Sequence, residues 1–178
     1  ELFGGWVEVA EKADVDLPNA MVLATSDEYG QPTTRVVLLK GLEDGALFFY
    51  TDYGSIKAQA LESNPRVSLN FFWAPLDRQI SILGIAERCS RERSDAYFGS
   101  RPRGSQISAY ISSQSQPIAD RATLDANYEA AETRFEGEDI PCKSSWGGYR
   151  VIPSEFIFWQ GRPSRLHDRF RYLLQDDG

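Results

Sequence analysis

The sequence is poor in the residues that hold metals and in long apolar runs. Its 178 residues include one histidine and two cysteines, Cys89 and Cys142, which lie far apart. Zinc and haem sites need more ligands than these, so we expect no metal site. The longest apolar runs, 36–39 and 46–50, fall far short of the ~20 residues that span a bilayer, which predicts no integral membrane protein. Scarce cysteines favour a reducing compartment, the cytoplasm, with a cleaved organellar targeting segment before Glu1 as the alternative.

Several nucleotide-binding and hydrolytic motifs are also missing. Gly99 and Gly104 have the spacing of a P-loop, but Ser105 and Gln106 stand where that loop needs its lysine and its serine or threonine. No G-x-G-x-x-G follows an expected strand, and no G-x-S-x-G surrounds a serine. These absences exclude a P-loop nucleotide triphosphatase, a Rossmann dinucleotide site and an α/β-hydrolase.

Basic residues are outnumbered, 19 against 26 acidic ones, which gives a net charge of -7. Nonspecific nucleic-acid binding depends on an excess of lysine and arginine, so we expect no nucleic-acid partner. Arginines are nevertheless concentrated in two segments, 88–103 and 150–171, each with five arginines against two acids. Such clusters favour binding of a small anion, and two solvated faces are the alternative.

Two cationic segments flank apolar strands. Arg35 and Lys40 bracket a buried-looking run, and strand alternation places them on opposite faces. After an aromatic strand end, Arg165, His167 and Arg169 occupy alternate positions, which predicts one cationic face of an extended chain.

Short, sequential apolar segments separated by turns predict a closed antiparallel barrel with helices packed outside it, rather than a parallel βαβ sheet. A hairpin is expected first, because 27–30 is a turn between two β-branched runs. The expected strands are 21–25, 33–40, 46–52, 66–73, 79–88, 148–152 and 155–160, with a last extended segment at 169–174. The expected helices are 55–62, 90–100 capped by Ser90, and one beginning at Asp120 and ending before Gly137.

Eight separated motifs occur in order along the chain. They are Arg35 to Lys40; Tyr50-Thr51 with Gly54-Ser55 and Lys57-Ala58; Arg78-Gln79; Tyr97-Phe98 with Ser100-Arg101-Pro102-Arg103; Ser105-Gln106-Ile107; Gln114-Ser115; Trp146-Gly147-Gly148-Tyr149; and Phe158-Trp159-Gln160 with Arg165-Leu166-His167-Asp168-Arg169. Together they resemble the pyridoxamine 5'-phosphate oxidase family, from about Pro18 to Leu173.

The resemblance implies a mainly β fold with helices, the FMN-binding split β-barrel, antiparallel and Greek-key-like with peripheral helices. It implies one domain over residues 1–178, whose N-terminal lid segment and C-terminal closing strand are incomplete. It further implies a homodimer with FMN at the subunit interface. The implied reaction converts pyridoxamine or pyridoxine 5'-phosphate to pyridoxal 5'-phosphate with O2 as acceptor, giving H2O2 and, from the amine, ammonia.

Site residues are implied by the same motifs. The FMN ligands would be Arg35, Val36, Val37, Leu38, Leu39, Lys40, Tyr50, Thr51, Lys57, Gln79, Gln114, Ser115, Trp159 and Arg169. Substrate would contact Lys40, Tyr97, Arg101, Ser105, Arg165, Leu166 and His167, with Arg165 and His167 as the catalytic pair.

Three positions depart from the family pattern. Ile56 replaces an arginine, Ser108 a glycine and Tyr110 a tryptophan. Two alternatives therefore stay open: a related flavin oxidase of another heterocycle, of the phenazine-pathway type, and a noncatalytic protein that binds FMN or pyridoxal phosphate. Lys40, Arg101 and Ser105, the implied phosphate contacts, argue against the first.

Overall fold

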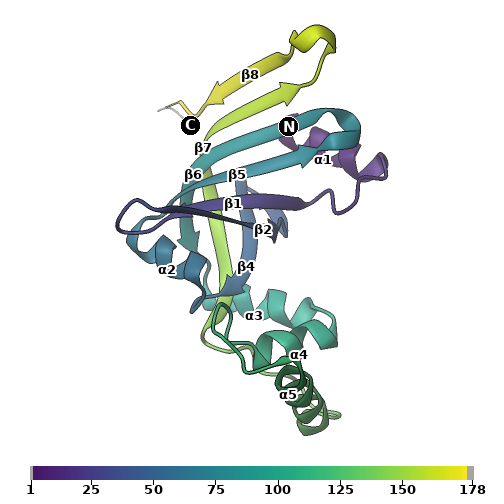
Figure 1. Cartoon of the computed structure of the whole chain (residues 1–178), viewed down its shortest axis with the longest axis vertical. Coiled ribbons are helices and arrows are strands. Elements are labelled where there is room, and N and C mark those ends of the chain that lie inside the picture. Colours follow the sequence, from purple (N-terminus) through teal and green to yellow (C-terminus); the bar gives the residue numbers. More distant parts are fainter. Residues whose placement is uncertain (1, 176–178) are drawn as a thin grey trace.

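A single curled antiparallel sheet forms the centre of the molecule (Figure 1). The computed structural model describes residues 2–175, so Glu1 and the last three residues of the expected domain lie outside it. The described strands are β1 (Ala20–Ser26), β2 (Pro32–Leu38), β3 (Gly41–Glu43), β4 (Ala46–Asp52), β5 (Arg66–Trp73), β6 (Arg78–Arg88), β7 (Trp146–Gln160) and β8 (Asp168–Leu173). Their order is β2-β1-β5-β6-β7-β4-β3, and β8 pairs with β7. The predicted class, mainly β with peripheral helices, is confirmed. The described strands form a curled half-barrel whose order runs from β2 to β3 without closing, so the expected closed barrel was wrong in this respect.

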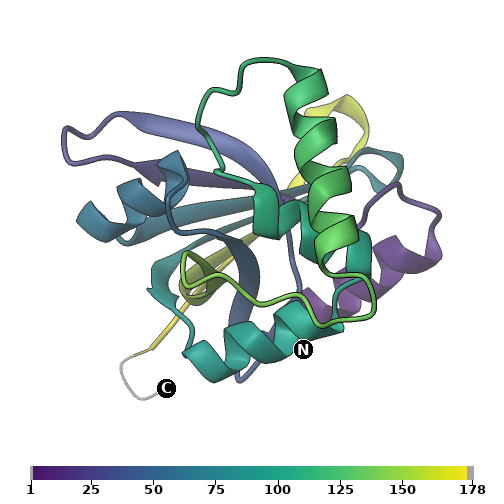
Figure 2. The same cartoon turned by 90° about the horizontal axis from the view of Figure 1, so that it is seen from below.

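Helices cover two sides of this sheet. They are α1 (Leu2–Lys12), α2 (Ile56–Ser63), α3 (Arg91–Ser100), α4 (Arg103–Ile111) and α5 (Arg121–Arg134), with 3-10 turns η1 (Ala74–Leu76) and η2 (Pro163–Arg165). Viewed from below, α3 to α5 lie together in front of the sheet (Figure 2). The predicted caps are confirmed: the Ser90 hydroxyl accepts from the Arg93 backbone N–H, and the Asp120 carboxylate accepts from that of Thr123. In the described part of the chain, no helix is long and apolar enough to cross a membrane.

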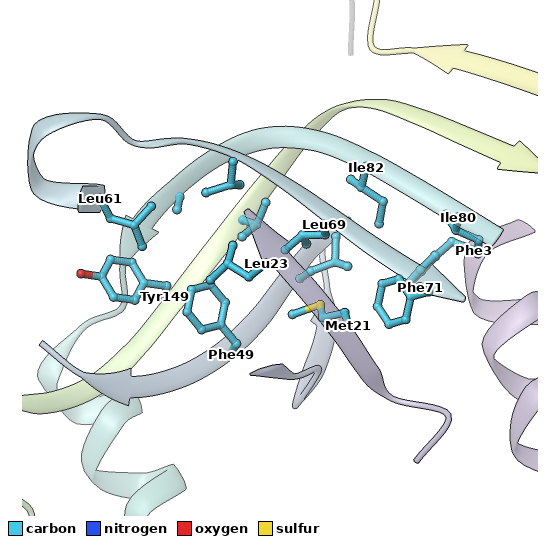
Figure 3. Packing of buried hydrophobic residues seen from close by; sticks show 14 of the residues in the cluster. Phe3, Met21, Leu23, Phe49, Leu61, Leu69, Phe71, Ile80, Ile82 and Tyr149 are labelled. Atoms are coloured by element: carbon cyan, nitrogen blue, oxygen red, sulfur yellow. The ribbon is translucent and has the colours of Figure 1, made fainter. Parts of the chain in front are cut away.

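Alternating burial on the strands builds the main core. In β5 the side chains of Val67, Leu69, Phe71 and Trp73 are buried, whereas those between them are at least partly exposed. Figure 3 shows Leu69 and Phe71 gathered with residues of the neighbouring strands on the concave side of the curled sheet. A second, smaller cluster lies beneath α3 to α5; it consists of Phe98, Ile107, Ala109, Ala131, Phe135, Ile140 and Trp146. The two clusters place α3 to α5 at one end of the sheet, whereas α1 packs against the main core, with its Trp6 ring 5.2 Å from that of Phe158.

Strand β7 differs from the sequence prediction, because one strand of fifteen residues replaces the two expected at 148–152 and 155–160. A register shift between Leu83 and Gly84 of β6 lets Pro153 sit within the strand. The bulge needs glycine at position 84, since a Cβ there would lie 2.5 Å from the Ile152 carbonyl oxygen. The sequence prediction also left out α1, β3 and α4.

The segment between β7 and β8 corrects a second expectation. Residues 163–165 form the turn η2, in which Ser164 and Arg165 have φ of 58° and 61°. Arg165 and His167 therefore do not continue the extended face of Arg169, which lies on β8. Two successive left-handed residues reverse the chain and bring β8 back onto β7.

Candidate active site: two groups of residues at opposite ends of one strand

One group of expected site residues surrounds a cavity of about 410 Å³ between β2, β4, α3 and α4. We call it the pocket group. The cavity is lined by Val36, Val37, Leu38, Lys40, Tyr50, Thr51, Asp52, Lys57, Tyr97, Arg101, Ser108, Ala109, Ser112, Gln114 and Trp146. Ten of the expected ligands are in this lining, although they come from four separate stretches of sequence.

Four other expected ligands adjoin this cavity without lining it. The Arg35 guanidinium turns toward β1, where it donates to the Leu23 carbonyl and the Thr25 hydroxyl, at 3.2 and 2.7 Å. Leu39 packs against the main core. Ser105 lies on α4, one turn before Ser108. The Ser115 hydroxyl accepts from the backbone N–H of Ile56 at the start of α2, at 3.4 Å.

Lys57 is the most confined cation of the pocket group, with 8% of its surface exposed. Its ammonium donates to three neutral oxygens: Thr51 Oγ1 at 3.0 Å, Ser55 Oγ at 3.2 Å and Gln114 Oε1 at 2.5 Å. Among the described residues, no carboxylate lies within ion-pair distance of it. Burial lowers the pKa of Lys57 to about 8; the nearby Arg35 lowers it too, and Asp52 opposes this. A bound anion would stabilise the charged form of Lys57, which burial and Arg35 disfavour.

Aromatic rings form one wall of the cavity. Tyr50 and Tyr97 stack with their centroids 3.7 Å apart, and Trp146 is nearly parallel to both. Tyr50 can lie flat against β7 because residue 148 is glycine: a Cβ there would lie 2.8 Å from its ring. The Arg101 guanidinium lies 4.8 Å from the Trp146 ring centroid, and burial lowers its pKa. Its Nη1 atom is buried and has no hydrogen-bond partner among residues 2–175.

These contacts test whether the residues suit the expected cofactor. A phosphate would give the buried Lys57 ammonium, whose present partners are all neutral, a partner of opposite charge. A second phosphate could accept a hydrogen bond from the unpartnered Arg101 nitrogen. Strand β2 is at the edge of the sheet, so one side of its backbone faces the cavity without a neighbouring strand. An unpaired strand edge offers N–H and C=O groups to a heterocyclic ring. The pocket group therefore fits FMN and a phosphorylated substrate.

A larger cavity, of about 840 Å³, opens between β4, β6 and α3. Its cations are already neutralised: Arg93 pairs with Glu43 at 2.5 Å, and Arg150 with Glu87 at 2.7 Å. Size alone would favour this cavity, but charge that is free to bind a ligand favours the smaller one.

The remaining expected ligands form a loop group at the other end of β7. Gln79, Trp159 and Arg169 lie side by side on β6, β7 and β8, because Trp159 is in register with both of the others. The His167 ring packs on Trp159 with centroids 4.7 Å apart. Arg165 and Leu166 are exposed in the loop before β8, Leu166 by 78%.

The two groups are far apart within one chain. Trp146, in the wall of the cavity, begins β7, and Trp159 lies thirteen positions later on the same strand. At about 3.3 Å per residue, roughly 40 Å of strand separates them. Figure 1 shows β7 running from the side of α3 and α4 to the side of β8. One copy of the chain therefore cannot bring both groups to one ligand.

Five residues of the cavity lining were not predicted as ligands: Asp52, Ser108, Ala109, Ser112 and Trp146. Trp146 was recognised only as part of a motif. Asp52 is buried and has Lys143 3.8 Å away, while the Lys143 ammonium donates to the Ser112 carbonyl at 2.5 Å. This link ties the loop before Gln114 to β4. Only the placement of Asp52 directly after Tyr50-Thr51 could have indicated it from sequence.

Two family models match consecutive parts of the chain. Residues 9–135 match the family model described as pyridoxamine 5'-phosphate oxidase. Residues 146–178 match the model described as pyridoxine 5'-phosphate oxidase C-terminal dimerisation region. The cavity thus draws mainly on the first match, and the loop group mainly on the second.

Curated relatives match over nearly the whole chain. The pyridoxine/pyridoxamine 5'-phosphate oxidase of Bordetella petrii is 54% identical over 176 residues, covering 99% of this chain and 83% of the relative. That of Alcanivorax borkumensis is 51% identical over 173 residues, covering 97% and 82%. The crystal structure of PhzG from Burkholderia lata, in complex with tetrahydrophenazine-1-carboxylic acid, superposes with a TM-score of 0.94 at 28% identity, covering 99% of this chain and 86% of that one. The predicted split-barrel fold is confirmed by this likeness.

Proposed function

The chain belongs to the pyridoxamine 5'-phosphate oxidase family, and on this premise we propose that it oxidises pyridoxamine and pyridoxine 5'-phosphate to pyridoxal 5'-phosphate. FMN is the cofactor and O2 the electron acceptor, so H2O2 is released, together with ammonia when the amine is the substrate. The observation that carries this function is identity of about half over nearly the full length to enzymes of that name. The chain acts as a homodimer, as its match to the dimerisation region implies.

The pocket group would hold both phosphorylated molecules. Lys57 is proposed to bind the FMN phosphate together with Arg35, because its buried ammonium has only neutral partners. The remaining FMN contacts in this group are Val36, Val37, Leu38, Leu39, Lys40, Tyr50, Thr51, Gln114 and Ser115. Arg101, with Lys40, Tyr97 and Ser105, would bind the substrate phosphate, which its unpartnered Nη1 atom supports. Two separate cation sets keep the two phosphates apart.

The loop group of the second subunit would complete each site. Gln79, Trp159 and Arg169 form one row across three strands and would meet the flavin. Arg165, Leu166 and His167 would then lie over the substrate. This arrangement explains why the loop group is exposed in a single chain, since its ligands belong to the partner.

When bound, FMN supplies the ring that accepts a hydride from the substrate C4' carbon and passes electrons to O2. The protein contributes position and charge. Contacts of Arg101 and Lys40 with the remote phosphate orient C4', so that binding energy is converted into rate. Arg165 and His167 would donate hydrogen bonds to polar atoms of the substrate and hold C4' in place for the transfer, and the rings of Tyr97 and Trp146 would limit the access of water.

A phenazine-pathway activity is the main rival. The likeness to PhzG at 28% identity shows the shared fold, but it is much lower than the 54% identity to a pyridoxine/pyridoxamine 5'-phosphate oxidase. Lys40 and Arg101 both line the cavity, where a phosphate would meet them. A substrate without an anionic group would leave the buried Arg101 nitrogen without a partner.

A turnover assay with peroxide detection tests the function. We expect the purified protein to release FMN on denaturation and to form H2O2 and pyridoxal 5'-phosphate from pyridoxamine 5'-phosphate. Unphosphorylated pyridoxamine is the control and should react poorly. A flavin-loaded protein that forms no product would favour the noncatalytic alternative, and recovery of FAD would contradict the cofactor assignment.

Mixed dimers test whether the site is shared between subunits. Lys57→Met removes a pocket residue and His167→Ala a loop residue, so each variant alone should be nearly inactive. In a dimer with one copy of each, one of the two sites has both groups intact. Random mixing should therefore restore about one quarter of wild-type activity, because half of the dimers carry one intact site. No recovery in isolated mixed dimers would place both groups of a site in one chain.

We further propose a cytoplasmic location. Cys89 and Cys142 are both free and half-buried, and a reducing compartment keeps such thiols unpaired. Fractionation of cells that express the protein at its natural level would test this location.

A further inference from the structure

Arg162 stands at the start of the loop between β7 and β8 and contacts two residues at the end of this loop, His167 and Asp168. Its guanidinium Nε donates to Asp168 Oδ2 at 2.7 Å, which joins the start of the loop to the start of β8. Its backbone N–H donates to His167 Nδ1 at 3.1 Å. The side chain of Arg162 thus joins the two ends of the loop, and its backbone N–H holds the imidazole of His167.

The turn between these contacts has an unusual backbone. Ser164 and Arg165 both have positive φ, 58° and 61°, and neither is glycine. Residues with side chains adopt this region only when surrounding contacts favour it. The ion pair of Arg162 with Asp168 closes the loop around these two residues, so it is placed to maintain the turn.

The contact with His167 determines where the imidazole proton lies. A neutral imidazole has one N–H donor and one lone-pair acceptor. Because Nδ1 accepts a hydrogen bond from the Arg162 backbone, the proton of the neutral ring is on Nε2. The Trp159 ring, 4.7 Å away, packs against the imidazole and restricts its rotation.

We propose that Arg162 and Asp168 are positioning residues that hold His167 in the Nε2–H tautomer. His167 then presents a hydrogen-bond donor to the substrate and does not serve as its base in that state. The proposal rests on the proposed function only in assigning the substrate as the group that Nε2–H meets. The tautomer itself is a property of the protein without cofactor or substrate.

The single histidine of the chain makes this proposal directly testable by nitrogen NMR. In ¹⁵N-labelled protein with the ring in its neutral form, we expect a pyrrole-type Nε2 and a pyridine-type Nδ1. Arg162→Ala and Asp168→Ala should move both signals toward the averaged values of an imidazole whose tautomers interchange. Arg162→Lys can keep the ion pair with Asp168 and should restore the wild-type pattern.

A matched control separates this effect from the loss of any surface ion pair. Arg121→Ala removes an exposed pair with Asp125 on α5, at 2.8 Å, far from the loop in sequence. The His167 signals should not change in this variant. A wild-type ring protonated on Nδ1, averaged wild-type signals, or unchanged signals in both loop variants would overturn the proposal.

Kinetics provide the second readout. The ion pair is largely exposed, so its loss should lower kcat by about two- to fivefold, the range for an exposed pair, with KM and FMN affinity unchanged. The double variant Arg162→Ala, Asp168→Ala should lose no more than either single variant, since both act through one contact. Additive losses would overturn the coupling. An inactive wild-type protein with the Nε2–H pattern would contradict only the proposed function, whereas an active one with averaged nitrogens would contradict only this inference.

Discussion

The pocket group and the loop group differ in how much of their structure one chain supplies. In the pocket group, Lys57 is 8% exposed and its ammonium already has three hydrogen-bond partners. In the loop group, Arg165 and His167 are exposed, and Leu166 is 78% exposed. The first group is packed before any ligand binds, and in the proposed dimer the second would receive its surroundings from the partner.

This difference suits the pocket group to binding phosphates and the loop group to acting on the bound substrate. Burying cations without carboxylates is unfavourable, and the cost is offset when a phosphate arrives. The pocket group therefore favours binding of an anion even before a ligand is present. The exposed loop group carries no such cost, and it gains its low-dielectric surroundings only when two chains meet. Strand β7 joins the two, because it begins at Trp146 and reaches the loop group at Trp159.

Removing the exposed side chains should break catalysis with little effect on flavin binding. Arg165→Ala and His167→Ala should each lower kcat by about 100-fold, the order of the cost when a reacting atom is misplaced by about 1 Å. The dissociation constant for FMN should change by less than a factor of two to three, since the pocket group is intact. Steady-state kinetics combined with flavin titration checks this. Arg101→Ala, from the other group, should instead mainly raise KM, and an unchanged kcat in both loop variants would show that neither Arg165 nor His167 is catalytic.

Removing the buried cation should do the opposite. Lys57→Met should weaken FMN binding by about 10- to 150-fold, because a hydrogen bond to a charged group contributes roughly 1.5–3 kcal/mol. Thermal unfolding of the apo-protein should show no loss of stability, since the substitution removes a buried charge whose partners are neutral.

A lysine on the surface is the control for this experiment. Lys12 pairs with Glu8 on α1 and is exposed, so Lys12→Met should leave FMN affinity unchanged. Equal effects of the two substitutions would mean that Lys57 acts only through the net charge of the protein.

Much of the fold could be predicted because its signals are local. The strand at 46–52 was predicted with the bounds that β4 has, and Ser90 and Asp120 were predicted as helix caps from one or two residues each. The continuity of β7 could not be predicted, because Pro153 is typical of a strand end unless the strand bulges there, as β7 does at Ser154 opposite Leu83 and Gly84. That bulge depends on Gly84, which lies about seventy positions earlier in the sequence.

The site was predicted as a set of residues but not as two groups. Motif order along the chain carries no information on which motifs share a cavity, so Lys57 and Arg169 were placed in one ligand list. Their separation follows from the length of β7 and from the pairing of β8 with it. The turn at Ser164 and Arg165 was also beyond prediction, because non-glycine residues rarely adopt positive φ.

The pKa of Lys57, lowered by burial to about 8 from a usual value of 10.5, predicts two opposite pH trends. Between these values the unfolded chain binds more protons at this position than the folded one, so the stability of the apo-protein should rise with pH. A phosphate favours the charged ammonium, so above pH 8 FMN binding must take up a proton, and affinity should fall by up to about tenfold per pH unit. Titrations and unfolding curves at several pH values check both trends. Lys57→Met should remove the contribution of this residue to the rise of apo-protein stability with pH, and it should flatten the fall of FMN affinity with pH. A wild-type FMN affinity independent of pH would contradict the role of Lys57.

The smallest expected effect concerns Ile56, where the family pattern has an arginine. The residue begins α2 next to Lys57, its side chain is 56% exposed, and its backbone N–H donates to the Ser115 hydroxyl at 3.4 Å. Because the position is exposed, an arginine there has room and needs no buried partner. Ile56→Arg should therefore tighten FMN binding by about two- to fivefold, the range for exposed charge pairs, and leave thermal stability unchanged.

The gain from Ile56→Arg should shrink as salt increases, since exposed charges are screened within about 8 Å at physiological ionic strength. Fluorescence titration of the apo-protein at two salt concentrations measures both effects, and Ile56→Gln, similarly polar but uncharged, is the control. An equal gain in the glutamine variant would assign the effect to removal of an exposed apolar side chain, and an unchanged dissociation constant for the arginine variant at low salt would show that Lys57 and Arg35 already neutralise the phosphate.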